Sequence, residues 1–146
     1  MAIDYRILNG PGSSRSFDFI PSMHGQHRHD RGGPDSFHIH EEAFLFLEGI
    51  VAEVFPDWHT GYHHWGLSSF SREIWFDILS GFPELRSDIR SNMRYEKIVR
   101  KYVPIPALLP RRLKFHRKAL LRFLDEFEER VRNSLERYSY MLISGV

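Results

Sequence analysis

The chain has 146 residues, of which 42% are hydrophobic and 27% are charged, and this is the size and balance of one globular domain with its own core. The composition argues against a disordered or collagen-like chain, and the lack of cysteine excludes disulfides, thiolate zinc sites and a catalytic thiol. No apolar stretch has the length of a secretory signal or a membrane span. We therefore expect a single domain over residues 1–146 and a cytoplasmic location.

The formal net charge of +1 conceals a strong asymmetry along the chain. Residues 1–66 carry four Lys or Arg against nine Asp or Glu, whereas residues 86–118 carry eleven against two. Such a layout indicates either that the two parts neutralise each other in the fold or that they present surfaces of opposite sign to partners.

The first forty residues favour extended structure and loop. Residues 5–8 and 16–20 are rich in apolar side chains and flank a turn-forming Asn-Gly-Pro-Gly at residues 9–12, so we expect a short N-terminal hairpin. From about residue 21 to residue 36 the chain is mostly Gly, His, Asp, Arg and Pro. This segment predicts a mobile His/Gly-rich loop.

The rest of the chain has apolar residues at helical spacing. We expect one helix over residues 37–55, capped by Asp35 or Ser36 and ended by Pro56, and a second from a Ser68 or Ser69 cap to about residue 79. A third should run from about Pro83 to residue 102, and the last should begin near residue 111. The sequence thus predicts a mainly α fold of about four helices, with a long C-terminal helix.

The last predicted helix has a heptad-like apolar seam. Its members repeat in threes and fours: Leu113, Leu120, Leu124, Phe127, Val131, Tyr138 and Met141. This seam either packs within one chain or pairs two chains as a homodimer.

Nine histidines suggest a metal site, but no complete ligand pattern is present. His59 and His63 have i,i+4 spacing, yet Gly61 lies between them and no Glu follows His59, so the pair is not the zincin motif. The chain also lacks a Gly-x-Ser-x-Gly elbow and a phosphate-binding glycine loop. We predict no metal, no cofactor, no catalytic residue and no enzymatic activity.

Cations form the sharpest pattern in the sequence. On a continuous third helix, spacings of three and four would place five of them on one face: Arg86, Arg90, Arg94, Lys97 and Lys101. Like charges at these spacings repel unless anions lie opposite them. The anions are carboxylates of this chain, carboxylates of a protein partner or nucleic-acid phosphates.

Residues 57–65 form a loop rich in aromatic and imidazole rings, among them Trp58, His59, Tyr62, His63 and Trp65. Large amphipathic rings in a loop are typical of an interface, because they supply contact area at low entropic cost. The same rings could instead fold back over the helical core, which is where most Trp side chains of a small domain lie.

The acidic amphipathic stretch at residues 41–55, followed by YHHWGLSSFSREIWFDIL at residues 62–79 and a further helix, resembles small bacterial immunity proteins. The similarity lies in the order and character of these segments over roughly residues 40–100. Such proteins are encoded beside polymorphic or contact-dependent growth-inhibition toxins and block them stoichiometrically. The resemblance implies a non-enzymatic binder that covers a toxin active site. The near-zero net charge favours a toxin with an acidic or mixed surface over a basic nuclease.

Taken together, these patterns predict a protein-binding module of the immunity type with no membrane association. Its predicted contact residues are Trp58, His59, Tyr62, His63, Arg86, Arg90, Arg94, Lys97 and Lys101. One alternative is a helical domain that binds nucleic acid through the same cations. A less favoured alternative is a metal-dependent enzyme ligated by His59, His63 and His64, with Asp57 or Glu42.

Overall fold

A computed structural model of the chain describes residues 3–24, 35–60, 67–104, 106, 109 and 116–145, without the side chains of residues 59 and 60. Its fold is α+β, so the prediction of a mainly α chain is wrong. The strands are β1 (Leu8–Asn9), β2 (Ser16–Ser22), β3 (Phe37–His40), β4 (Leu67–Ser71) and β5 (Tyr140–Gly145). They form one five-stranded antiparallel sheet in the order β1-β3-β2-β5-β4.

The predicted N-terminal hairpin does not form, because β3 lies between its two arms. Leu8 of β1 lies opposite His38, and Phe19 of β2 lies opposite Phe37 on the other side of β3. The C-terminal strand β5 is also internal, since it pairs with β2 on one side and with β4 on the other. The sheet is therefore assembled from segments far apart in the chain.

The helices are α1 (Glu41–Val54), α2 (Arg72–Leu79), α3 (Phe82–Arg90), α4 (Tyr95–Tyr102) and α5 (Arg117–Arg137), with a short 3-10 helix at Pro56–Thr60. The predicted third helix is thus two helices, separated by a turn at residues 91–94. The predicted first helix begins four residues late, because Phe37–His40 is strand β3. Its N-cap is His40, whose Nδ1 accepts the N–H of Glu42 at 3.2 Å, and not Asp35 or Ser36.

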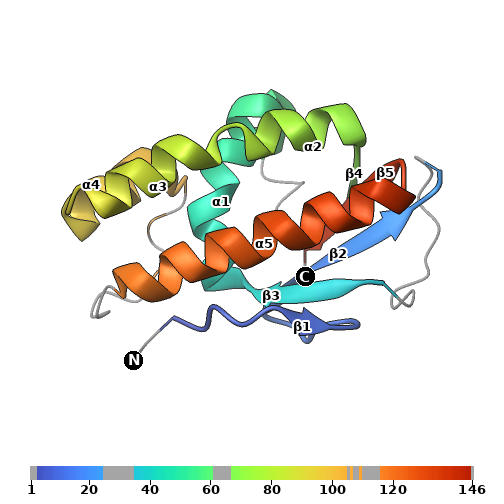
Figure 1. The fold of residues 1–146 in the computed structure, drawn as a ribbon, viewed down its shortest axis with the longest axis horizontal. Coiled ribbons are helices and arrows are strands. Elements are labelled where there is room, and N and C mark those ends of the chain that lie inside the picture. The colour runs from blue at the N-terminus through green and yellow to red at the C-terminus, as the bar shows by residue number, and fades with distance from the viewer. Residues whose placement is uncertain are drawn as a thin grey trace.

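Aromatic rings join the helices to one face of the sheet. Phe19 of β2 is fully buried at the centre, with its ring 5.1 Å from that of Phe127 on α5 and 6.1 Å from those of Phe44 on α1 and Trp75 on α2. Figure 1 shows α5 in front of the sheet and roughly along β2, with α2 and α3 following one another alongside it. The Phe82 ring of α3 lies 6.1 Å from that of Phe127, so α3 and α5 pack side by side, and the candidate site lies where they meet.

Most of the predicted loop at about residues 21–36 lies outside the described residues, although Pro21 and Ser22 belong to β2. The seam residues Tyr138 and Met141 are not helical, since α5 ends at Arg137 and Met141 lies in β5. Among the described residues, no helix is both long enough and apolar enough to cross a membrane.

Candidate functional site: the basic end of the α3–α4–α5 layer

A Schellman turn reverses the chain between α3 and α4. Asn92 has φ 60°, in the left-handed region, and its N–H bonds the carbonyl of Ile89 at 3.4 Å. The N–H of Met93 bonds the carbonyl of Asp88 at 3.3 Å, which completes the pattern in which the end of a helix satisfies its last carbonyls. The turn makes α3 and α4 antiparallel, so cations spaced for one continuous helix lie on two.

Ionic contacts between the two helices neutralise one of the predicted contact residues. Lys101 Nζ lies 2.8 Å from both Glu84 Oε1 and Asp88 Oδ2, and Tyr102 donates its hydroxyl to Asp88 at 2.5 Å. The hydrogen bonds from Lys101 and Tyr102 hold the pKa of the Asp88 carboxyl below its ordinary value. Lys101 therefore ties α4 to α3.

Arg86 is neutralised in a similar way by α5. Its side chain is only 14% exposed; Nε donates to Asp125 at 2.9 Å and Nη2 donates to Glu128 at 2.6 Å. Burial raises the pKa of Glu128, but the hydrogen bonds from Arg86 and Arg132 outweigh it, so this pKa lies below its ordinary value. Arg86 is therefore a structural link between α3 and α5.

The other three predicted cations remain exposed around the turn. Arg90 is the last residue of α3, Arg94 is the N-cap of α4, and Lys97 lies in the first turn of α4. Within the described part of the chain, none of the three has a carboxylate within 4 Å. They form the first half of an exposed basic surface.

The second half is the beginning of α5. Arg117 Nη1 donates to the carbonyl of Ile89 at 3.3 Å, which places the first turn of α5 against the C-terminal end of α3. This turn contains no acidic residue, and the N-cap His116 makes no side-chain capping bond. Its cations oppose the helix dipole, whose N-terminal end is positive. The basic end, as we call it, comprises Arg90, Arg94, Lys97, His116, Arg117, Lys118 and Arg122.

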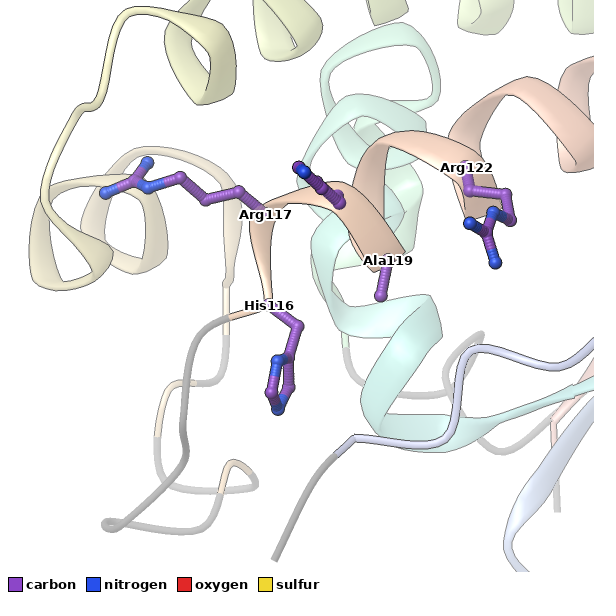
Figure 2. Close-up of a pocket in the computed structure, with 5 residues that line it drawn as sticks. His116, Arg117, Ala119 and Arg122 are labelled. Atoms are coloured by element: carbon purple, nitrogen blue, oxygen red, sulfur yellow. The ribbon is translucent and has the colours of Figure 1, made fainter.

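A surface hollow of about 490 Å³ lies at the beginning of α5, lined by His116, Arg117, Lys118, Ala119 and Arg122. Figure 2 shows that Arg117 reaches towards the α3–α4 side, whereas His116 points downwards in the view, away from Arg117, and Arg122 lies further along the helix. The side chains spread apart and do not converge on one point. This geometry suits contact with a broad anionic surface better than capture of one small anion.

The predicted ring-rich surface is not at this end. Trp58 is 2% exposed and donates Nε1–H to the buried Glu48 carboxylate at 2.8 Å, so it is a core residue. Of His59 only the backbone is described, and Tyr62, His63, His64 and Trp65 lie outside the described residues. The structure therefore brings Arg90, Arg94 and Lys97 together with α5, but it does not bring Trp58 to the same surface.

The described histidines have local roles. His38 Nδ1 lies 2.8 Å from the carbonyl of Gly10, and His40 caps α1. Over the ranges that the structure describes, no three His, Asp or Glu side chains form a group suited to a metal ion. Asp57 is exposed, and Glu42 lies in the first turn of α1.

Sequence reasoning noted the run of cations before the last helix but did not select Lys118 or Arg122 as contact residues. The signal for Lys118 was the excess of eleven basic over two acidic residues in the segment 86–118, whereas Arg122 lies beyond that segment. Spacing along one helix could not reveal that α5 would begin beside the end of α3. Comparison of the chain with protein families, curated proteins and solved structures finds no match, so the function is argued from the site itself.

Proposed function

We propose that this chain is a non-enzymatic protein-binding module whose basic end docks on an acidic surface of a protein partner. The observation that carries the proposal is a set of exposed cations where α3, α4 and α5 meet, Arg90, Arg94, Lys97 and Lys118, which have no carboxylate within 4 Å among the described residues. The resemblance to immunity proteins supplies the class of partner: a toxin domain with an acidic or mixed surface. Docking would inhibit the toxin by occlusion, with no turnover.

The internal contacts of Arg86 and Lys101 support the distinction between structural cations and cations that are left for a partner. The chain uses these two cations to fix α3 against α5 and α4, whereas Arg90, Arg94 and Lys97 at the end of the same layer have no carboxylate within 4 Å among the described residues. Cations crowded at the start of α5 are unfavourable in the free protein. Their retention is reasonable if a bound carboxylate surface relieves the repulsion.

A protein partner fits better than nucleic acid, because the basic end presents few rings for base stacking. Tyr102 is 6% exposed, and the hydroxyl of the half-buried Tyr95 is itself buried. Proteins that bind single strands combine cations with exposed aromatic side chains. Nucleic acid is therefore the competing outcome of the experiment below.

The experiment compares capture by three forms of the immobilised protein from an extract of its native host, at low and at high salt. The test variant carries Arg90→Glu and Lys97→Glu. The control carries Arg15→Glu and Arg137→Glu, which change the net charge by the same amount. Both arginines are exposed: Arg15 lies in the loop before β2, and Arg137 is at the C-terminal end of α5. We expect one near-stoichiometric protein on the wild type and the control, with at least tenfold less on the test variant.

Two results would contradict the proposal. Equal capture by all three forms would show that the basic end does not contact the partner. Nucleic acid that is released steeply as salt rises, with no protein partner, would favour the nucleic-acid alternative.

A further inference from the structure

The sheet has an open edge at its N-terminal side. Strand β1 is the outermost strand, and residues 3–7 lead into it along the bottom of Figure 1. Their side chains alternate as in a strand: Ile3, Tyr5 and Ile7 pack against the core, whereas Arg6 is exposed. The segment continues the line of β1 beyond the point where β3 becomes α1.

The backbone of this segment has no backbone partner. No backbone hydrogen bond joins residues 3–7 to any other part of the described chain. Gly10 donates its N–H to Ser36, next to β3, so strand alternation turns the N–H and C=O groups of Asn9, Ile7 and Tyr5 away from β3. The Arg6 N–H bonds Asp4 Oδ1 at 3.0 Å, but the outward-facing N–H and C=O groups of Tyr5 and Ile7 have no hydrogen-bond partner in the described chain. Unpaired groups of this kind are a template for another strand.

The sequence of the segment is chemically palindromic: Ile3-Asp4-Tyr5-Arg6-Ile7, or apolar, acid, aromatic, base, apolar. When two copies pair in antiparallel fashion about Tyr5, Asp4 lies opposite Arg6 and Ile3 lies opposite Ile7, each pair occurring twice. Directly opposed residues on antiparallel strands have Cβ atoms about 4.5–5.5 Å apart, which suits an ion pair. Pairing centred on Arg6 places Arg6 opposite itself, and pairing centred on Asp4 places Asp4 opposite itself, so the symmetric alternatives to Tyr5 oppose like charges.

Asp4 and Arg6 already form an ion pair within one strand, and the proposed pairing adds a second ion pair to each of them. Arg6 Nε donates to Asp4 Oδ1 at 2.9 Å and Arg6 Nη2 donates to Asp4 Oδ2 at 2.8 Å, on a side chain that is 71% exposed. With a second strand opposite, acids and bases alternate around a ring of four, so each carboxylate lies between two guanidinium groups. No existing contact has to break.

We propose that a second copy of this chain is the occupant of this edge, so that two molecules join through residues 3–7 into one continuous sheet across a two-fold axis. A two-fold interface requires a self-complementary surface, and the palindrome supplies one. The proposal uses none of the cations of the basic end, so either proposal can fail without the other.

The test is sedimentation equilibrium of the purified protein at concentrations up to about 0.5 mM, a range that detects weak association. The variant Asp4→Arg carries two cations in the segment, and the variant Arg6→Asp carries two carboxylates. Each reverses both cross-strand pairs, so we expect each variant alone to dimerise at least about tenfold more weakly than the wild type. An equimolar mixture of the two restores opposite charges and should form a heterodimer as strong as the wild-type dimer.

Controls separate this result from loss of the fold. Arg15→Asp removes an equally exposed arginine that also pairs with a carboxylate, Glu41, and should leave dimerisation unchanged. Circular dichroism should be the same for all forms, because Arg6 and Arg15 are exposed. A wild-type chain that stays monomeric, variants that dimerise as the wild type does, or a mixture without heterodimer would each overturn the proposal. Persistence of the dimer in both variants would indicate pairing elsewhere, such as through α5.

Discussion

At the scale of the residue, the backbone of Asn92 decides where the cations of the third predicted helix lie. An uninterrupted helix would carry Arg86, Arg90, Arg94, Lys97 and Lys101 on one face. The left-handed conformation of Asn92 ends α3 and brings Lys101 back to Glu84 and Asp88. Asparagine adopts this conformation more readily than other residues with a Cβ atom, because its side chain bonds locally. The left-handed φ of one residue thus moves Lys101 from a row of like charges into ion pairs within the chain.

Substitution at this position tests that account. Alanine has a Cβ but no local polar bond, so Asn92→Ala should lower the free energy of unfolding by about 1 kcal/mol. Glycine has no Cβ penalty there, so Asn92→Gly should change it by less than about 0.5 kcal/mol. Urea unfolding of both variants measures the difference. Equal stabilities for the alanine and glycine variants would show that the left-handed conformation does not matter.

At the scale of the element, α5 has opposite electrostatics at its two ends. Arg137 in its last turn is favourable to the helix dipole, whereas Arg117 and Lys118 in its first turn are unfavourable. Arg117 has the carbonyl of Ile89 as a partner, but no hydrogen bond or ion pair holds Lys118 within the described chain. The cations in the first turn of α5 therefore lower the stability of the free protein at the surface that we assign to the partner.

The variant Lys118→Glu should separate stability from binding. A carboxylate in the first turn of a helix favours it, so we expect the free energy of unfolding to rise by about 1 kcal/mol in urea titrations. Lys118→Gln, which only removes the charge, should give about half of that rise. Capture of the partner should fall for Lys118→Glu. A less stable variant would contradict this electrostatic account of the helix start.

The elements that the sequence failed to predict share a physical cause. Strand β3 passes directly into α1, β4 passes directly into α2, and only two residues separate α5 from β5. Without glycine or proline at these junctions, the apolar spacing of each helix runs on into the strand, and short apolar runs fit both periods. His40 also caps α1 although imidazole is not among the preferred caps.

The candidate site could be predicted only in part for a similar reason. The excess of cations in residues 86–118 is a property of composition, and it does mark the basic end. Which cations remain exposed depends on tertiary contacts: Arg86 reaches Asp125 and Glu128 about forty residues further along the chain. Helical spacing describes neighbours one turn apart and contains no information about such partners.

At the scale of the whole molecule, β5 is the strand on which the sheet depends. It is hydrogen-bonded to β2 and β4, and its residues Met141, Leu142 and Ile143 are at most 1% exposed. Burial of each such side chain contributes about 1.5–3 kcal/mol. Together they approach the whole net stability of a domain, about 5–15 kcal/mol.

Removal of residues 140–145 should therefore abolish folding and not merely weaken it. Without β5, strand β4 has no partner in the sheet and β2 loses the strand that is hydrogen-bonded along one of its edges. Circular dichroism and amide chemical-shift dispersion would report the loss, with a chain shortened only by residue 146 as the control. A cooperative unfolding transition in the shortened chain would show that β5 is dispensable.

The central position of β5 also orders events while the protein is being made. Synthesis proceeds from the N-terminus, so β1, β2, β3 and β4 leave the ribosome before the strand that joins β2 to β4 exists. Until then the nascent chain carries one three-stranded piece, β1-β3-β2, and the unpaired segment of β4. Exposed strand edges of this kind favour aggregation or binding by chaperones. The sheet can therefore close only after β5 has been synthesised, which makes closure a late step that depends on contacts between segments far apart in the chain.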